Sequence, residues 1–259
     1  MRDSPASPAW FRRHFNEDYL VLYSGRSQEQ AEREVGFIVG QLEVRRQESV
    51  LDLCCGFGRH LRAFRRRGIR AVGVDLSAAL LTVARERLDT ELVCADMLQL
   101  PFRGGTRGSG GTRGFEVLVN FFTSFGYFES RSDNHRAASE MARVLRPGGR
   151  FSLDLMNRDR TLRELAPRTK RRSGQFEIHE ERSHDRERDR IDKRIVLHDT
   201  RSGDVKKYFE SVQLYGEEEI SRLLCEVGLE VTEVFGDFAD VPFDADSPRM
   251  IVTGRRSSA

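Results

Sequence analysis

Residues 50–60 read VLDLCCGFGRH, a short apolar strand that leads through a glycine turn into a helix. Gly56 and Gly58 allow a ligand to approach the backbone closely, and the first N–H groups of the helix can bind a carboxylate or another anion. In open α/β sheets, ligands bind at the carboxyl ends of the strands. The stretch therefore predicts a ligand site where this strand ends.

The chain beyond this turn alternates between short apolar runs and amphipathic helices. Gly68 and Ser77 stand where a C-terminal and an N-terminal helix cap are needed, and Pro147 stops a later helix. The alternation predicts a parallel sheet with crossover helices. The expected elements are helices over 59–67, 78–88 and 133–145 and strands over 69–76, 91–95, 115–120 and 150–156. The glycine-rich segment 103–114 is expected to be a flexible loop.

Two other regions have a different residue pattern. An N-terminal stretch rich in aromatic residues precedes a helix expected over 28–41. After residue 170, three segments with strand-like alternation cover 175–184, 190–198 and 205–215, and predict a three-stranded antiparallel insert. In the third segment, Glu210 interrupts an apolar face, which indicates a partly wet surface. A helix over 217–227 and two closing strands follow.

Composition limits the function classes. The chain has 259 residues, 38% of them hydrophobic and 32% charged, with a formal net charge of +2. These values fit a globular protein with a core, and charge alone predicts no polyanionic partner. The four cysteines have neither CxxC spacing nor a disulfide framework, so we expect a reducing compartment and no metal. We find no signal-peptide h-region and no apolar run of ~20 residues, and therefore expect a cytoplasmic protein.

A second carboxylate strengthens the case for a nucleotide-like ligand. Asp75 ends the next predicted strand, where a carboxylate can accept hydrogen bonds from both hydroxyls of a ribose. The stretch around Asp52, Gly56 and Gly58 resembles the D-x-G-x-G-x-G pattern of the class I S-adenosylmethionine-dependent methyltransferases. Cys54 takes the place of the first glycine, a departure that bears on the geometry of the turn. The resemblance runs from about residue 49 to 155.

The resemblance implies a fold and a cofactor site. The fold is a Rossmann-like seven-stranded α/β sheet with helices on both faces, plus an antiparallel β insert after the fifth strand. In the family, the residue corresponding to Asp75 binds the ribose, and those corresponding to Asp96 and Met97 lie by the adenine. The strand end at Asn120 and Phe121 lies beneath the methionine moiety. The implied contacts to S-adenosylmethionine come from Tyr23, Asp52, Cys54, Gly56, Gly58, Asp75, Leu76, Asp96, Met97, Asn120 and Phe121.

Three alternatives are disfavoured. A nicotinamide dehydrogenase needs a third small residue in its glycine motif, and that place falls to Leu61. Methyltransferases that act on DNA adenines or glutamine amides carry a D/N-P-P-Y/F tetrad, whereas residues 120–123 here read NFFT. The arginines over 62–67 can contact RNA phosphates, but their spacing is typical of a solvated helix face, so a nucleic-acid partner is disfavoured.

We therefore expect an enzyme that moves a methyl group to an O or N atom of a small-molecule acceptor. Residues 1–46 would form a helical cap, 47–168 with 216–259 the methyltransferase domain, and 169–215 a roof over the acceptor. The open alternative is a cofactor-binding protein that performs no methyl transfer. Exposed strand edges of the insert could pair between two subunits, so a homodimer is a further possibility. No spacing selects a catalytic base among His14, His60, Tyr127 and His179.

Overall fold

The computed structural model describes residues 10–104, 107–108, 111–112 and 114–258. The expectation that the chain has no signal-peptide h-region rests largely on residues 1–9, which lie outside the described part. The expected flexible loop over 103–114 lies partly outside it. The helices are α1 Phe11–His14, α2 Asp18–Leu22, α3 Gln28–Gln41, α4 Arg59–Arg66, α5 Ala78–Arg87, α6 Arg131–Val144, α7 Arg158–Arg163 and α8 Glu217–Glu226. The strands are β1 Ser49–Leu53, β2 Arg70–Asp75, β3 Glu91–Cys94, β4 Arg107–Gly108, β5 Gly111–Thr112, β6 Phe115–Asn120, β7 Leu145–Leu155, β8 Arg168–Ser173, β9 Phe176–Asp185, β10 Arg190–Asp199, β11 Val205–Gln213, β12 Leu229–Phe235 and β13 Met250–Arg256.

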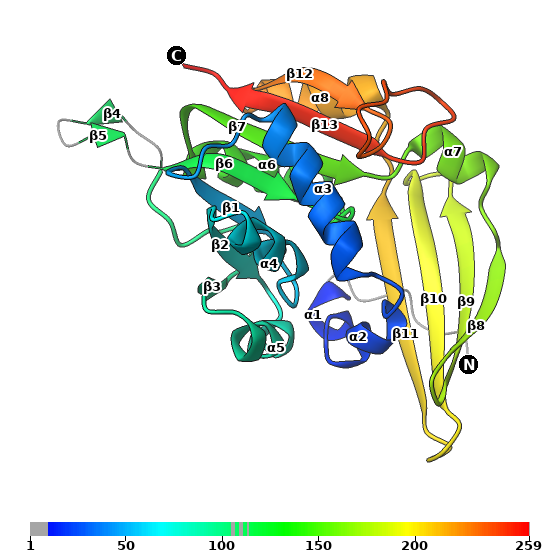
Figure 1. Cartoon of the computed structure of the whole chain (residues 1–259). Coiled ribbons are helices and arrows are strands. Elements are labelled where there is room, and N and C mark those ends of the chain that lie inside the picture. The colour runs from blue at the N-terminus through cyan, green and yellow to red at the C-terminus, as the bar shows by residue number, and fades with distance from the viewer. Residues whose placement is uncertain (1–9, 105–106, 109–110, 113, 259) are drawn as a thin grey trace.

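The central sheet has seven strands in the order β12-β13-β7-β6-β1-β2-β3 (Figure 1). Strands β3, β2, β1, β6 and β7 run parallel, and β13 pairs antiparallel with both β7 and β12. The expected mixed α/β sheet is therefore confirmed. Parallel strands place their carboxyl ends at one edge, so the residues that follow β1, β2 and β3 meet there.

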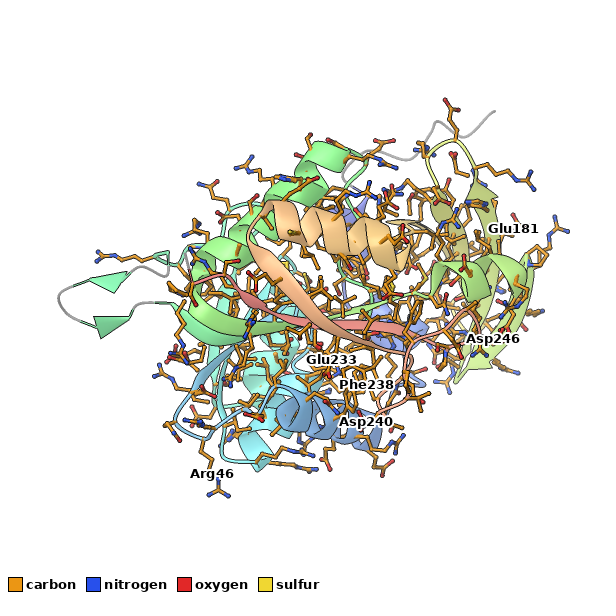
Figure 2. All side chains as sticks on the ribbon, turned by 90° about the horizontal axis from the view of Figure 1, so that it is seen from above. Arg46, Glu181, Glu233, Phe238, Asp240 and Asp246 are labelled. Atoms are coloured by element: carbon orange, nitrogen blue, oxygen red, sulfur yellow. The ribbon has the colours of Figure 1, made fainter. Side chains whose placement is uncertain are left out.

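Helices cover both faces of the central sheet. On one face Val35 and Ile38 of α3 pack with Leu61 and Phe64 of α4 in one core cluster. On the other face residues of α6 and α8, including Met141, join the larger cluster. Charged side chains cover the periphery, as Figure 2 shows for Arg46 and Glu181. This two-sided burial explains why the strand sequences are almost continuously apolar.

The antiparallel insert has four strands, in the order β11-β10-β9-β8, where the sequence predicted three. The additional strand, β8, reads RTKRRS and pairs with β9 along the edge of the insert. Lysine and arginine are common on edge strands because they oppose further strand pairing, and they hide the apolar alternation that identifies a strand. The short helix α7, which the sequence also did not reveal, links β7 to the insert.

The N-terminal helices lie between the two sheets. Trp10 and Phe11 join the larger core cluster, and Leu22 packs on the insert with Ile178, Ile195 and Leu197. In Figure 1, α1 and α2 lie beside β11, below the ends of the central strands. None of the helices in the described part of the chain is long and apolar enough to cross a membrane.

Candidate functional site

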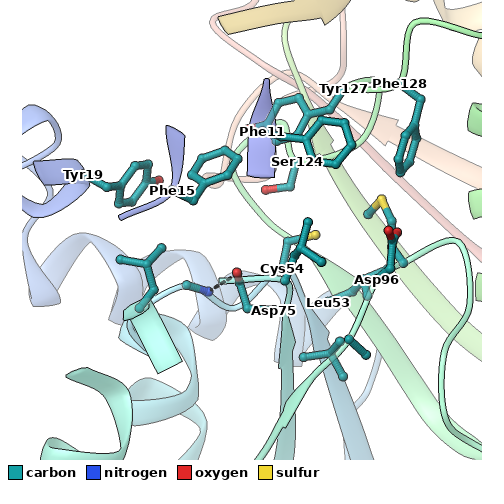
Figure 3. A pocket seen from close by; sticks show the side chains of 16 residues that line it. Phe11, Phe15, Tyr19, Leu53, Cys54, Asp75, Asp96, Ser124, Tyr127 and Phe128 are labelled. Carbon is teal, nitrogen blue, oxygen red and sulfur yellow. Dashed lines mark hydrogen bonds between the residues drawn. The ribbon is translucent and has the colours of Figure 1, made fainter. Parts of the chain in front are cut away.

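The first cavity, which we call the sheet cavity, lies at the carboxyl ends of β1, β2 and β3. It holds about 660 Å³ of empty space, part of it open to solvent. Figure 3 shows it between the strand-end residues Cys54, Asp75 and Asp96 and a group of aromatic rings. The lining residues are Phe11, Phe15, Tyr19, Leu53, Cys54, Gly56, Val74, Asp75, Leu76, Leu80, Ala95, Asp96, Met97, Ser124, Tyr127 and Phe128.

Asp75 is held rigidly at the cavity wall. The backbone N–H of Gly56 donates to its Oδ2 at 2.7 Å, and that of Ser77 donates to its Oδ1 at 2.8 Å. Burial raises the pKa of this carboxyl above its usual range, and the backbone hydrogen bonds oppose that shift. Each carboxylate oxygen has further acceptor capacity, so Asp75 can still receive two hydroxyl donors from a ligand.

The glycine turn serves two different purposes. Gly56 has φ +56° and lines the cavity, where its missing side chain leaves room for a ligand. Gly58 has φ +83°, and a Cβ there would come within 2.4 Å of Leu88 Cδ1, so its glycine is required by helix packing. Cys54 has φ +63°, a left-handed conformation that costs a non-glycine residue about 1–2 kcal/mol. The cysteine that replaces the first motif glycine is therefore strained.

Asp96 and Met97 follow β3 on the same side of the cavity. Oδ2 of Asp96 accepts a hydrogen bond from Arg12 Nη2 at 2.7 Å, and its Oδ1 accepts one from the backbone N–H of Leu98 at 3.0 Å. Met97 is almost fully buried and presents an apolar wall. The structure thus brings Cys54, Gly56, Asp75, Leu76, Asp96 and Met97, predicted from the sequence, around one cavity.

The other predicted contacts lie elsewhere. Asp52 is buried beneath the turn, and Asn120 donates from Nδ2 to the Leu53 carbonyl at 2.8 Å. Phe121 stacks on His60 with ring centroids 3.9 Å apart, within the core beside α4. Together with Gly58, these residues are absent from the cavity lining. Tyr23 lines a second cavity, described below.

Arg26 is a half-buried cation that the sequence did not single out. Its guanidinium carbon lies 4.5 Å from the centroid of the Tyr23 ring and also contacts the ring of Phe122. Its Nη2 has no hydrogen-bond partner among the described residues, and burial lowers the pKa of Arg26. An unpaired buried guanidinium is costly, so this position suits an anionic ligand group.

The second cavity, which we call the insert cavity, lies between the central sheet, the N-terminal helices and the insert. It holds about 820 Å³ of empty space, part of it open to solvent. Phe15, Tyr19 and Tyr127 line both cavities and form what we call the shared wall. The lining residues are Phe15, Tyr19, Tyr23, Phe122, Thr123, Tyr127, Met156, Thr161, Leu165, Arg182, Ile191, Lys193, Glu210, Val212 and Arg249.

A row of charged residues crosses the insert face of this cavity. Arg182, Lys193 and Glu210 are direct cross-strand neighbours on β9, β10 and β11. Lys193 Nζ donates to the Tyr23 hydroxyl at 2.9 Å and to Glu210 at 3.2 Å. The Tyr23 hydroxyl donates to Glu210, whose Oε1 also lies 2.7 Å from His14 Nε2. The sequence predicted a partly wet surface at Glu210, whereas in the structure this side chain is mostly buried and lines the cavity.

Glu210 is a permanent anion near neutral pH. Burial alone would raise its pKa, but the hydrogen bond from His14 and the charge of Lys193 outweigh burial and lower the pKa to about 2. A carboxylate in this state is a weak base. Its contacts instead orient Tyr23 and Lys193 within the cavity.

A strained turn forms another part of the insert cavity. Phe122 and Thr123 have φ +63° and +51°, and left-handed non-glycine residues cost roughly 1–3 kcal/mol each. Asp154 stabilises the turn, because its Oδ2 accepts from the Phe122 N–H at 2.7 Å and its carbonyl from the Thr123 N–H at 2.8 Å. Arg249 donates to Asp154 Oδ1 at 2.6 Å and to Thr123 Oγ1 at 2.8 Å.

The structure also locates the four bases considered from the sequence. His14 is buried against Glu210, and His60 lies 2.7 Å from Glu34 beneath the aromatic core. His179 is half exposed on the insert surface. Tyr127 lies in the shared wall, and burial raises its pKa well above the usual value. Tyr127 is thus the one of these four that lines either cavity.

Metal chemistry receives no support from the described residues. Within them, no cluster of three or more His, Cys, Asp or Glu side chains has the arrangement of a metal site. The four cysteines, all inside the described ranges, are free thiols. Burial raises the pKa of Cys54 well above its usual range, so this thiol stays protonated at the cavity wall.

Comparisons with known proteins agree with this geometry. Residues 50–149 match the family model described as a methyltransferase domain. A dTDP-3-amino-3,4,6-trideoxy-alpha-D-glucopyranose N,N-dimethyltransferase of Streptomyces venezuelae is 35% identical over 134 residues, which cover 51% of this chain and 52% of that protein. A probable tRNA methyltransferase 9B of Homo sapiens is 33% identical over 104 residues, which cover 40% of this chain and 20% of that protein. The chain spans about half the length, or less, of these curated relatives.

Solved structures extend the likeness to the whole fold. The CcbJ methyltransferase from Streptomyces caelestis superposes with a TM-score of 0.77 at 17% identity, covering 94% of this chain and 97% of that one. An amino pentose methyltransferase from Micromonospora echinaspora, solved with S-adenosylmethionine bound, has a TM-score of 0.66 at 19% identity and covers 93% and 97%. Residues 50–149 are therefore a methyltransferase domain, and the chain as a whole has the fold of the S-adenosylmethionine-dependent methyltransferases.

Proposed function

We propose that this protein transfers a methyl group from S-adenosylmethionine in the sheet cavity to an O or N atom of a small molecule in the insert cavity. The observation that carries the proposal is the meeting of two cavities at one shared wall. A displacement reaction needs its two partners in line and in contact, and two adjoining cavities supply that arrangement. The insert cavity combines aromatic and aliphatic side chains with a few charged ones, as suits a small molecule.

The residues of the sheet cavity fit the cofactor. Asp75 would accept the ribose hydroxyls, and Asp96 with Met97 would flank the adenine. Gly56 leaves space at the backbone. Arg26 lies over the ring of Tyr23, outside the lining of the cavity, and its Nη2, which has no hydrogen-bond partner among the described residues, would bind the carboxylate of the methionine part. When bound, S-adenosylmethionine supplies an activated methyl group on a sulfonium. The aromatic rings of Phe15, Tyr19 and Tyr127 would attract that cation and exclude water from the transfer.

Proton transfer places a limit on the acceptor. Burial raises the pKa of the Tyr19 and Tyr127 hydroxyls, so both stay protonated and act as hydrogen-bonding groups. Glu210 is a weak base because its pKa is low. We infer that the acceptor atom reaches the shared wall already in a nucleophilic state, for example as a neutral amine or an ionised acid, so that no strong protein base is required.

We also propose that three segments of the chain have different roles. Residues 1–46 cover the cofactor, 47–168 with 216–259 form the methyltransferase domain, and 169–215 roof the acceptor. In support, Phe15, Tyr19 and Tyr23 come from the first segment and the charged row from the third. A homodimer formed through insert edge strands stays a prediction.

Calorimetric titration of the purified protein with S-adenosylmethionine, S-adenosylhomocysteine and NADH tests the cofactor. We expect micromolar binding of the first two, about −8 kcal/mol, and none of NADH. Amino-sugar nucleotides, quinols and tRNA, each supplied with S-adenosylmethionine, are then assayed for S-adenosylhomocysteine. Turnover confined to small molecules supports the proposal. Turnover of tRNA alone would contradict it, and cofactor binding without turnover of any acceptor would favour a protein that performs no methyl transfer.

A further inference from the structure

We propose that the acceptor of the insert cavity carries an anionic group, a carboxylate or a phosphate, bound by Arg249 and Arg182, together with an apolar body. This inference rests on the proposed function, because it assigns the chemistry of the acceptor in the same cavity. It starts from the charges that face the cavity. Arg182, Lys193 and Arg249 supply three cationic side chains, whereas Glu210 is the single carboxylate among the lining residues.

The lining carboxylate is already engaged. Glu210 receives hydrogen bonds from the Tyr23 hydroxyl and Lys193, and His14 Nε2 lies 2.7 Å from its Oε1. Lys193 is engaged in turn, since Tyr23, Glu210 and Glu180 all lie within 3.5 Å of its Nζ. Lys193 and Glu210 therefore satisfy each other and offer little to a ligand.

The two arginines are engaged only in part. The hydrogen bonds of Arg249 to Asp154 and Thr123 use Nε and Nη2 and do not involve Nη1. Those of Arg182 to Thr169 and Glu180 use Nη1 and Nη2 and do not involve Nε. Guanidinium N–H groups are rigid donors that bind carboxylate and phosphate oxygens well. Each arginine thus brings a donor group to the cavity beyond its existing bonds.

The balance of charge favours an anion. Glu180 and Asp154 lie behind the arginines and, with Glu210, balance the three lining cations. The buried Arg26 guanidinium beside Phe122 then makes the surroundings positive. A cationic acceptor would find the single lining carboxylate already engaged, while an anionic one can bind the guanidinium donors that Arg249 and Arg182 do not use.

The strained turn gives an independent reason to expect a ligand at Arg249. Phe122 and Thr123 hold left-handed conformations because Asp154 binds their N–H groups, and the same carboxylate fixes Arg249. Strained backbone of this kind persists where surrounding contacts enforce it, and it gathers at functional sites. Here it fixes the direction of one guanidinium at the cavity. Met156, Leu165, Ile191 and Val212 supply the apolar remainder of the lining.

A matched series of small aromatic probes tests the inference without knowledge of the natural acceptor. The protein is first saturated with S-adenosylhomocysteine, and that binding is measured. Phenylacetate, phenyl phosphate, phenylacetamide and phenethylamine are then titrated into the complex. We expect both anions to bind at least ten-fold more tightly than the neutral amide, and the amine to bind most weakly. Comparison of the affinities for phenylacetate and phenyl phosphate shows whether the site prefers a carboxylate or a phosphate.

Three variants locate the binding. Arg249→Gln is expected to weaken both anions at least ten-fold, and Arg182→Gln, which leaves the strained turn untouched, several-fold. Arg168→Gln is the matched control, because Arg168 lies on the same insert with an 82% exposed side chain paired to Glu181. It should change nothing. Affinity for S-adenosylhomocysteine should stay within two-fold in all three.

Several results would overturn the inference. The inference is wrong if phenylacetate and phenylacetamide bind equally tightly, if phenethylamine binds most tightly, or if neither anion binds. It is also wrong if neither Arg249→Gln nor Arg182→Gln reduces the affinity for the anions. If S-adenosylhomocysteine binds normally in such a case, the proposed function stands and only the acceptor class is wrong. Failure of S-adenosylhomocysteine to bind would contradict the proposed function itself.

Discussion

The two cavities of this protein are built in opposite ways. The sheet cavity takes its polar residues from the ends of successive parallel strands, so Cys54, Asp75 and Asp96 occur in chain order within 43 consecutive positions. The insert cavity joins residues as distant as Tyr23 and Arg249. Strand topology places the carboxylates of the first cavity, whereas the charged residues of the second come together only through the packing of distant segments. Variants that act on one cavity and spare the other therefore test this separation.

The largest effect is expected from Asp75→Asn. The amide keeps one acceptor oxygen but replaces the other by an NH2 donor and removes the charge, which should weaken S-adenosylmethionine binding about 100-fold, close to 3 kcal/mol. Titration calorimetry measures the loss, and circular dichroism checks that the variant is folded. Asp89→Asn, an exposed change just beyond α5, is the control. Unchanged cofactor affinity in Asp75→Asn would remove Asp75 from the site.

Glu210→Gln should act on the insert cavity through stability. The folded-state pKa of Glu210 is about 2 against 4.5 for the free side chain, so the stabilisation is present above about pH 5 and lost as the pH falls toward 2. We expect the variant to be less stable by about 2 kcal/mol at pH 7 and equal to the parent near pH 2. Denaturant titrations across this range measure the difference.

The control for this prediction is Glu181→Gln, an exposed carboxylate of β9 paired with Arg168. Surface pairs contribute roughly 0–1 kcal/mol, so its pH dependence should be nearly flat. A constant stability difference between Glu210→Gln and the parent from pH 7 to 2 would refute the ion-pair origin of the effect. Cofactor affinity should be unchanged in both variants.

Arg26→Met separates the two ends of the cofactor. If Arg26 binds the methionine carboxylate, S-adenosylmethionine should bind about ten-fold more weakly, or about 1.4 kcal/mol. 5′-Methylthioadenosine lacks that carboxylate, so its affinity should be the same in variant and parent. The exposed change Arg46→Met serves as the control. An equal loss for both ligands would instead indicate general damage to the cavity.

Cys54→Gly is expected to have the smallest effect. Glycine relieves the left-handed strain at φ +63° and should stabilise the fold by about 1 kcal/mol, as measured by denaturant unfolding. Cys55→Gly is the matched comparison, because this neighbouring residue is buried outside the left-handed region and should lose stability instead. Loss of stability in both variants would show that the thiol packing of Cys54 outweighs its strain.

The sequence predicted the central sheet well because both faces are buried and leave continuous apolar runs. It predicted the sheet cavity for the same reason, since each strand end is visible in the pattern. Asn120 binds the backbone of Leu53 beneath that cavity, and Phe121 packs into the core, so neither side chain lines it. The left-handed residues Phe122 and Thr123 then form a turn after β6. The local sequence does not predict such a turn, because the left-handed conformation is usually adopted by asparagine or glycine and not by phenylalanine or threonine.

The insert was harder to predict. Its edge strand β8 is a run of basic residues without apolar alternation, so the sequence revealed three strands where four exist. The roles of Glu210 and Lys193 depend on their contacts with Tyr23, which lies 187 and 170 positions away, respectively. Arg26 belongs to no sequence motif. Only the structure distinguishes it, because its Nη2 has no hydrogen-bond partner among the described residues.

The attachment of the N-terminal helices to β11 also bears on how the chain matures during synthesis. Asp18 binds Lys206 and Tyr208, and Tyr23 binds Glu210, at separations of 187 to 190 positions. A ribosome adds these partners only after most of the protein has emerged. These contacts of the first two helices cannot form while the central strands assemble, so the apolar side chain of Leu22, which packs on Ile178, Ile195 and Leu197 of the insert, is open to binding by chaperones. Nascent chains halted before residue 205 should accordingly be held by such factors, and chains that include β11 should be released.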